Sequence, residues 1–168
     1  MYHKILVPID GSKTAMAGLE EAVKLAKVHH GRIRVFHVVN EFILDYSYAA
    51  GMYASNLIAS LRESGERILR QAEAFVREHG IEVDGVLQES IGGPAAELIM
   101  TQAQQWRPDL IVMGTHGRRG LRRLALGSDA ESVVREATMP VLLVHGPAET
   151  GAAAPQAAKD PAAKAGAG

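Results

Sequence analysis

The chain of 168 residues contains no cysteine, which excludes disulfides, thiolate catalysis, iron–sulfur clusters and cysteine-ligated zinc. It also has no excess of either charge, because 18 lysines and arginines accompany 19 aspartates and glutamates, for a formal net charge of −1. A dedicated nucleic-acid or membrane-surface binder carries a basic excess. We therefore expect neither nucleic acid nor a membrane among its partners.

Long apolar runs are absent as well, and no segment approaches the roughly 18 continuous apolar residues of a membrane span. Residues 1–10 have neither the apolar stretch nor the small-residue cleavage site of a signal peptide. These absences predict a soluble, cytoplasmic protein. Its length suffices for one domain with a substantial core and is too short for two.

Large apolar side chains are missing from the end of the chain. From residue 146 to residue 168 the only hydrophobic residues are ten alanines, and the rest are mainly glycine, proline and charges that cancel. Such a segment cannot bury enough surface to offset the entropy of ordering it. We expect a folding unit over residues 1–145 and a flexible Ala/Gly/Pro-rich tail over residues 146–168.

In the rest of the chain, short apolar runs alternate with segments of helical periodicity. Strands are predicted at 4–9, 33–39, 81–88, 109–113 and 140–144. Helices are predicted from Ser12 to a C-terminal glycine at Gly31, from Leu57 to Gly80, from Gly93-Pro94 to Pro108, and over 128–137. The alternation predicts a single doubly wound α/β domain: a parallel five-stranded sheet with helices on both faces. Ligands of such sheets bind beside the strands where the winding reverses, which directs attention to the loops after the first and fourth strands.

The loop after the fourth strand carries a glycine pattern, Gly114-x2-Gly117-x9-Gly127-Ser128. Glycines let backbone N–H groups approach an anion, and the last pair stands at a helix N-terminus, which favours phosphate. Residues 110–128 contain four arginines and no acid, so this segment is positively charged although the chain as a whole is balanced. A local positive charge of this kind favours the binding of a polyphosphate.

A structural interpretation of the same loop stays open. Ser128 and Glu131 fit a capping box, which needs no ligand, and the glycines and arginines fit a solvated turn. Asp129 is an objection to phosphate binding unless its carboxylate points away or holds a metal. Asp10, after the first strand, is either a turn former or a ligand-binding carboxylate.

Two further features have alternatives. Residues 40–54 hold half of the eight aromatic side chains, which suits a nucleotide lid or a docking surface for a protein partner, although packing against the core is the favoured interpretation. His116 is the only histidine of the candidate site and either contacts phosphate, acts as an acid or base, or is an ordinary loop residue. Walker, nucleophile-elbow and His-Glu-x-x-His motifs are all absent, so no dedicated catalytic turnover is predicted.

The chain resembles the universal stress protein family, in its ATP-binding branch. The resemblance covers nearly all of residues 1–145. It rests on Ile5–Ser12, His37–Val39, Gly93-Pro94, Asp109–Gly117 with the glycine spacing above, and Met139–Val144.

The resemblance implies the strand order 3-2-1-4-5 and a role for each matching residue. Asp10 would hold the ribose with Gly114 nearby, and Pro8, Val38 and Met113 would line the adenine pocket. Backbone groups at Gly117, Gly127, Ser128 and Asp129 would hold the phosphates, with His116 and Arg118 adjacent. Members usually pair through the fifth strand, here Val141–Val144, whose apolar edge would otherwise be an aggregation hazard. Asp129 departs from the family, where an apolar or small polar residue is common.

The sequence thus predicts a homodimeric, ATP-binding regulatory switch of the stress response, with Mg²⁺ as a further candidate ligand. The alternatives are a slow nucleotide hydrolase and a ligand-free dimeric, chaperone-like interaction module.

Overall fold

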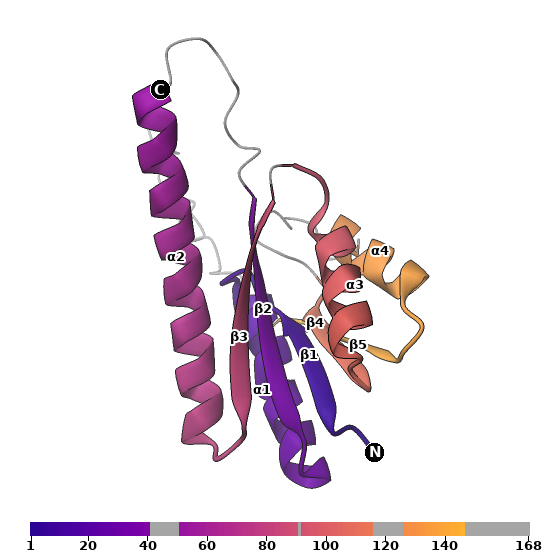
Figure 1. Ribbon diagram of the computed structural model, residues 1–168. Helices are drawn as coiled ribbons and strands as arrows, with labels where there is room; N and C mark the ends of the chain where they lie inside the picture. Colours follow the sequence, from indigo (N-terminus) through magenta and orange to yellow (C-terminus); the bar gives the residue numbers. More distant parts are fainter. Residues whose placement is uncertain (41–50, 91, 116–125, 147–168) are drawn as a thin grey trace, which may run out of the picture.

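The computed structural model describes residues 1–40, 51–90, 92–115 and 126–146. Strands and helices alternate along these ranges (Figure 1). The strands are β1 (Lys4–Pro8), β2 (Arg32–Asn40), β3 (Val83–Ser90), β4 (Leu110–Gly114) and β5 (Val141–Val144). The helices are α1 (Lys13–His29), α2 (Gly51–Glu78), α3 (Ala95–Trp106) and α4 (Ser128–Glu136).

The strands form one parallel sheet in the order β3-β2-β1-β4-β5. The chain builds the sheet outward from β1 to β3, returns to the other side of β1, and continues with β4 and β5. This confirms the predicted doubly wound α/β fold and its strand order. The winding reverses between β1 and β4, where Leu6 pairs with Ile111.

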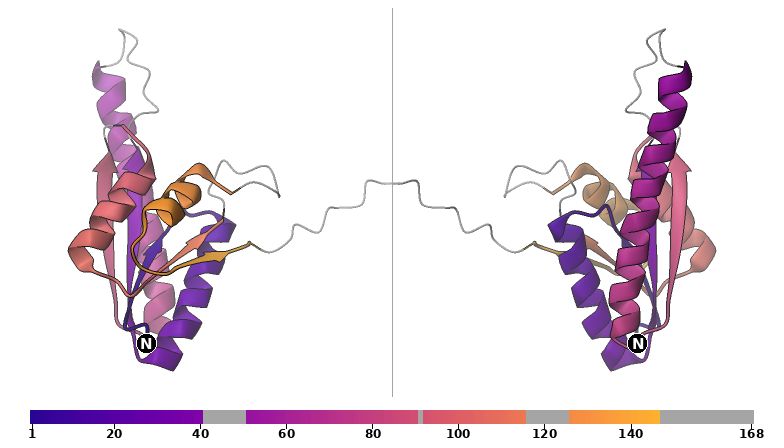
Figure 2. Two further views of the ribbon diagram at one scale, coloured as in Figure 1. Left: turned by 90° about the vertical axis from the view of Figure 1, so that its right-hand side faces the viewer. Right: turned by 90° about the vertical axis from the view of Figure 1, so that its left-hand side faces the viewer.

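Helices cover both faces of the sheet, with α1 and α2 on one face and α3 and α4 on the other (Figure 1 and Figure 2). Ile5, Leu6 and Val7 are each 0% exposed, because successive side chains of β1 point into opposite cores. Ile5 and Val7 join the core under α1 and α2, and Leu6 joins the core under α3 and α4. This two-sided burial explains why the strands read as continuous apolar runs.

Helix α1 is capped at both ends. Ser12 is its N-cap, and the Ser12 hydroxyl accepts a hydrogen bond from the Ala15 N–H at 3.1 Å, as the sequence predicts. At the other end the left-handed residue is His30 (φ 50°), so the prediction that Gly31 ends the helix is wrong by one position. Gly31 is small for a different reason, because a Cβ there would lie 2.6 Å from the Tyr2 carbonyl oxygen.

Helix α2 begins earlier than predicted, at Gly51 instead of Leu57, so residues 51–54 are helical and do not belong to a link. Its amino-terminal turns extend beyond the carboxyl ends of β2 and β3 (Figure 1). No face of the sheet requires an apolar stripe there, so the periodicity that predicts a helix is missing. Gly80 has a φ of 74°, as expected of the glycine that closes this helix.

Charged side chains cover the outer helix faces. Pairs such as Arg77–Glu73 in α2 and Arg135–Glu131 in α4 have i,i+4 spacing. Exposed pairs of this kind contribute about 0.3–0.5 kcal/mol each, so the two apolar cores dominate the stability. Within the described ranges, no helix is both long enough and apolar enough to cross a membrane.

Candidate functional site

The candidate site lies where the winding of the sheet reverses. β1 leads into α1 on one face, and the chain after β4 leads to α4 on the other (Figure 2). Parallel strands whose connections leave to opposite faces bind ligands at their carboxyl ends. The described residues at this position are 8–12 after β1, and 113–115 and 126–130 after β4.

Asp10 builds the turn between β1 and α1. One of its carboxylate oxygens accepts the Ser12 N–H at 2.9 Å, and Gly11 between them has a φ of 80°. Asp10 is therefore a turn former, as one of the two predicted roles requires. A carboxylate has about four lone-pair positions, so this bond is compatible with the second predicted role, contact with a ligand.

Two contacts with β2 fix the position of Ile9, the residue before Asp10. The Ile9 N–H donates to the Phe36 carbonyl at 2.8 Å, and the Ile9 carbonyl oxygen lies 2.7 Å from the His37 Nδ1 atom. A carbonyl only accepts, so this nitrogen carries the proton of that bond. His37 is 6% exposed and holds the backbone that leads into Asp10. This role of His37 was not predicted from the sequence, although a lone histidine in an apolar strand was the available signal.

Three residues predicted to line an adenine pocket lie on one face of adjacent strands. Val38 of β2 and Met113 of β4 both pack with the core under α3 and α4. Pro8 of β1 shares this face with Leu6, because side chains alternate along a strand. Met113 is buried, whereas Pro8 and Val38 are half-buried. The structure therefore brings these three residues to the same edge and the same face of the sheet.

Gly114 is needed where α1 approaches the end of β4. A Cβ at this position would lie 2.9 Å from the Thr14 carbonyl carbon, so only glycine fits without movement of α1. Gly18, one turn further along α1, faces the same strand end, and a Cβ on Gly18 would lie 3.4 Å from the Gly114 nitrogen. Gly114 thus brings the turn of Asp10 close to β4.

The first turn of α4 presents backbone donors at the same sheet edge. Gly127 is the N-cap, and its own N–H donates to the Thr115 carbonyl at 2.9 Å. The first intrahelical bond runs from the Glu131 N–H to the Gly127 carbonyl at 2.9 Å. The N–H groups of residues 128–130 precede that bond and have no intrahelical acceptor. Together with the helix dipole, these donors favour an anion.

The capping box considered for this helix does not form. A capping box needs Ser at the N-cap and Glu three residues later. Here Gly127 takes the N-cap without a side-chain hydrogen bond, which moves Ser128 into the first helical position. The Glu131 carboxylate instead pairs with Arg135 at 2.6 Å. The donors of the first turn are therefore not taken up by a capping box of Ser128 and Glu131.

Asp129 directs its carboxylate to the neighbouring helix. Its Oδ1 atom accepts the Ala96 N–H, in the first turn of α3, at 3.2 Å. The N-cap of α3 is Pro94, which has no side-chain cap of its own. Asp129 is therefore a cap supplied by α4 to α3, a role that no local sequence pattern predicts.

The middle of the glycine-patterned loop lies outside the described residues, and with it His116, Gly117 and Arg118. The start of the loop is anchored to β5. The Thr115 N–H donates to the Val144 carbonyl at 3.0 Å, and the Thr115 hydroxyl lies 3.3 Å from the His145 Nδ1 atom. These bonds fix the point from which the loop departs.

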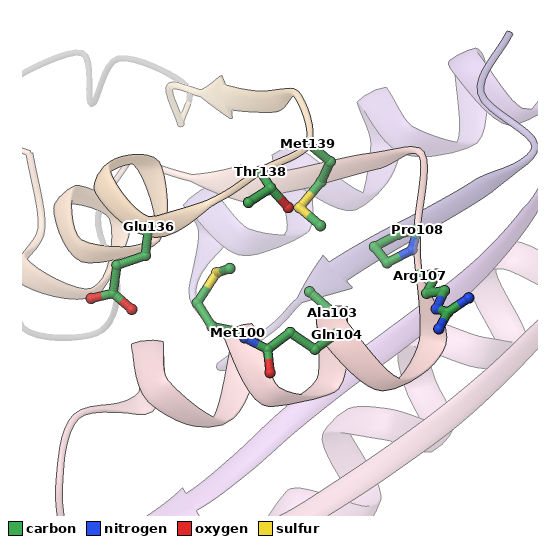
Figure 3. A pocket seen from close by; sticks show the side chains of 8 residues that line it. All are labelled: Met100, Ala103, Gln104, Arg107, Pro108, Glu136, Thr138 and Met139. Atoms are coloured by element: carbon green, nitrogen blue, oxygen red, sulfur yellow. The ribbon is translucent and has the colours of Figure 1, made fainter.

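A cavity of about 430 Å³ lies elsewhere, between α3 and α4 (Figure 3). Its lining residues are Met100, Ala103, Gln104, Arg107, Pro108, Glu136, Thr138 and Met139. Pro108 and Met139 precede β4 and β5, so the cavity opens at the amino ends of these strands, opposite the candidate site. In the part of the chain that the structure describes, no three His, Asp or Glu side chains gather as a metal site.

Similarities to known proteins extend over most of the chain. A model of the universal stress protein family matches residues 1–145. The universal stress protein MJ0531 of Methanocaldococcus jannaschii is 34% identical over 151 residues, which cover 88% of this chain and 84% of that protein.

Solved structures extend the comparison to the fold. MJ0577 of the same organism superposes with a TM-score of 0.75 at 27% identity, over 86% of this chain and 96% of that one. A universal stress protein in complex with cAMP superposes with a TM-score of 0.59 at 22% identity, over 87% of this chain and 98% of that one. A universal stress protein from Archaeoglobus fulgidus in complex with dAMP superposes with a TM-score of 0.58 at 21% identity, over 85% of this chain and 98% of that one. At these identities the similarity concerns the fold alone.

Proposed function

The chain belongs to the universal stress protein family, and we propose that it binds ATP and acts as a cytoplasmic, nucleotide-dependent regulatory switch. The observation that carries the proposal is the pairing of two polar features at one switch point of the sheet. One is the carboxylate turn of Asp10, and the other is the set of N–H donors of residues 128–130 that precede the first intrahelical bond of α4. A nucleotide needs contacts of both kinds.

In the proposed complex the base lies over the end of the sheet. Pro8, Val38 and Met113 share one face there, where the half-buried Pro8 and Val38 offer the adenine ring an apolar surface and Met113 is buried beside them. The Asp10 carboxylate accepts hydrogen bonds from the ribose hydroxyls, and such charge-assisted bonds are short and strong. The fixed Ile9 backbone places this carboxylate before the ligand arrives, which lowers the cost of ordering it on binding.

The phosphates bind at the first turn of α4 in this proposal. The N–H groups of residues 128–130 point along the helix axis toward the anion, and Ser128 is exposed beside them. The Gly127 N–H is already bonded to the Thr115 carbonyl, so it is not one of these donors. The role of Gly127 is to have no side chain that would block the approach of the phosphates. His116, Gly117 and Arg118 remain predicted phosphate contacts.

Mg²⁺ has no cage of side chains among the described residues. Asp129, the acid nearest to the proposed phosphates in sequence, has its Oδ1 atom on the Ala96 N–H. The described side chains therefore do not fit a resident metal, and a magnesium ion that accompanies ATP would depend on the phosphates for its ligands.

We also propose a homodimer through β5. All four residues of Val141–Val144 are apolar and only half-buried, and β5 is an edge of the sheet. An exposed apolar edge strand pairs readily with a second copy. This edge equally favours the alternative of a ligand-free dimeric interaction module, which predicts a dimer that binds no nucleotide.

Titration calorimetry with ATP distinguishes the proposed ATP-binding switch from the ligand-free interaction module. We expect saturable binding to the wild-type protein, a strong loss in Asp10→Ala and Gly127→Val, and little change in the circular dichroism of either variant. Valine at 127 would place a branched side chain among the phosphate donors. If both variants bind ATP as the wild type does, the site is wrongly placed. If the wild type shows no heat and no rise in melting temperature at millimolar ATP, the interaction module is favoured.

A further inference from the structure

Asp129 occupies the second position of α4, within the row of N–H donors proposed to bind phosphate. Its side chain does not cap its own helix, and its Oδ1 atom accepts the Ala96 N–H of α3 at 3.2 Å. Ala96 is itself in the first turn of a helix whose N-cap, Pro94, makes no side-chain bond. One carboxylate thus lies at the amino-terminal ends of two helices.

This bond fixes a negative charge near the proposed phosphate position. Asp129 is half-buried, and its carboxylate is held by the Ala96 N–H, so it cannot swing freely into solvent when an anion arrives. Asp129 carries one of the N–H groups of this first turn, so a phosphate bound there would lie within about one helix pitch, roughly 5–8 Å, of its carboxylate. At that distance two like charges still repel appreciably at a partly screened protein surface.

We propose that Asp129 is a specificity-determining residue that lowers the affinity for ATP relative to AMP. The inference rests on the proposed nucleotide site. The repulsion grows with the charge that a ligand places at the first turn of α4, so it weakens triphosphate binding more than monophosphate binding. Coulomb's law with a dielectric near that of water, reduced further by salt screening, gives about two- to threefold weaker binding for each added phosphate charge at this separation. ATP carries two such charges more than AMP, so we expect its binding to be weakened about four- to ninefold more than that of AMP.

The same carboxylate has a structural role, which the variants must separate from its charge. Asp129→Asn retains an Oδ1 acceptor for the Ala96 N–H and removes the charge. Asp129→Ala removes both, so we expect it to melt a few degrees below Asp129→Asn, as the loss of a helix cap does in a domain of this size. Glu131→Gln is the matched control, because it removes one negative charge from the same helix at an exposed side chain paired with Arg135.

The experiment is calorimetric titration of ATP and AMP into wild type, Asp129→Asn and Glu131→Gln, in low salt with EDTA. We expect the ATP affinity of Asp129→Asn to rise about five- to tenfold and its AMP affinity to rise less than threefold, with the difference shrinking at high salt. Glu131→Gln should keep the ATP-to-AMP affinity ratio within about twofold of the wild-type ratio.

The outcomes separate this inference from the proposed function. If wild type binds both nucleotides and Asp129→Asn leaves their affinity ratio unchanged, Asp129 is a helix cap only and the inference fails while the site stands. An equal shift in Glu131→Gln would mean a general charge effect and would also overturn it. If neither wild type nor Asp129→Asn binds any nucleotide, the proposed function fails, and the inference fails with it.

Discussion

Replacement of Gly65 by alanine tests the link between α2, His37 and the turn of Asp10. A Cβ at position 65 would lie 2.8 Å from the His37 Cδ2 atom and 2.9 Å from both the Leu87 Cδ1 and the Val39 Cγ2 atoms. Real Cβ atoms do not approach heavy atoms this closely, so at least one of the three side chains must move. His37 and Val39 are buried in β2 and have little room to do so.

Two opposing effects set the size of the result. Alanine in place of glycine inside a helix stabilises by about 0.5–1 kcal/mol. Overpacking of a filled core costs about 1–3 kcal/mol. Because three side chains are contacted at once, the packing cost exceeds the gain, and we expect the free energy of unfolding to fall by about 0.5–2 kcal/mol. A displaced His37 imidazole would also lose its hydrogen bond to the Ile9 carbonyl, which is worth about 0.5–1.5 kcal/mol. Because this bond positions the backbone before Asp10, we expect ATP to bind about three- to tenfold more weakly.

Urea denaturation of Gly65→Ala measures the first effect, and calorimetric titration with ATP measures the second. Glu63→Ala is the control, because it introduces alanine on the exposed side of the same helix and should stay within about 0.5 kcal/mol of wild type. If Gly65→Ala is more stable than wild type and binds ATP equally well, the packing of His37 against α2 has no bearing on the site.

Three further predictions concern the other elements of the site. Gly114→Ala should lower the free energy of unfolding by about 1–3 kcal/mol in urea denaturation, because its Cβ would meet the Thr14 backbone at 2.9 Å; an unchanged midpoint would contradict the close approach of α1 to β4. His37→Asn should bind ATP more tightly than His37→Leu at similar melting temperatures, because only the amide can donate to the Ile9 carbonyl; equal affinities would show that the bond is not used. Leu143→Pro should yield a monomer in analytical ultracentrifugation. N–H groups of the β4 side bond to the carbonyls of residues 140 and 144, so the backbone groups of residue 143 point to the open edge of β5. Proline at this position removes the N–H that a second copy would need for pairing. A persistent dimer would exclude pairing through β5.

The fold could be predicted because its signals are local. Ile5–Val7 and Ile111–Val112 are buried on both faces, so each strand appears as an apolar run bounded by turns. The ends of helices were less predictable. His30 takes the left-handed conformation in place of Gly31, and α2 begins at Gly51, where no sheet face imposes periodicity.

In the candidate site, too, the local features could be predicted from the sequence and the contacts between distant residues could not. Asp10 and the Gly127-Ser128 pair were predicted because they follow strands and precede helices, which a single sequence reveals. The His37–Ile9 and Asp129–Ala96 bonds join residues 28 and 33 positions apart, and only the packed structure brings these partners together. The second bond changes the meaning of Asp129, whose carboxylate is a cap for α3 in addition to a charge beside the proposed phosphates.

Under the proposed function, this chain holds an adenine nucleotide at the switch point between β1 and β4. Mass spectrometry of the small molecules released on denaturing the native protein tests it most directly, with Gly127→Val purified in parallel. We expect about one ATP per wild-type chain and a large reduction in the variant. Release of no adenine nucleotide from wild type, together with no rise in melting temperature on addition of millimolar ATP, would contradict the claim.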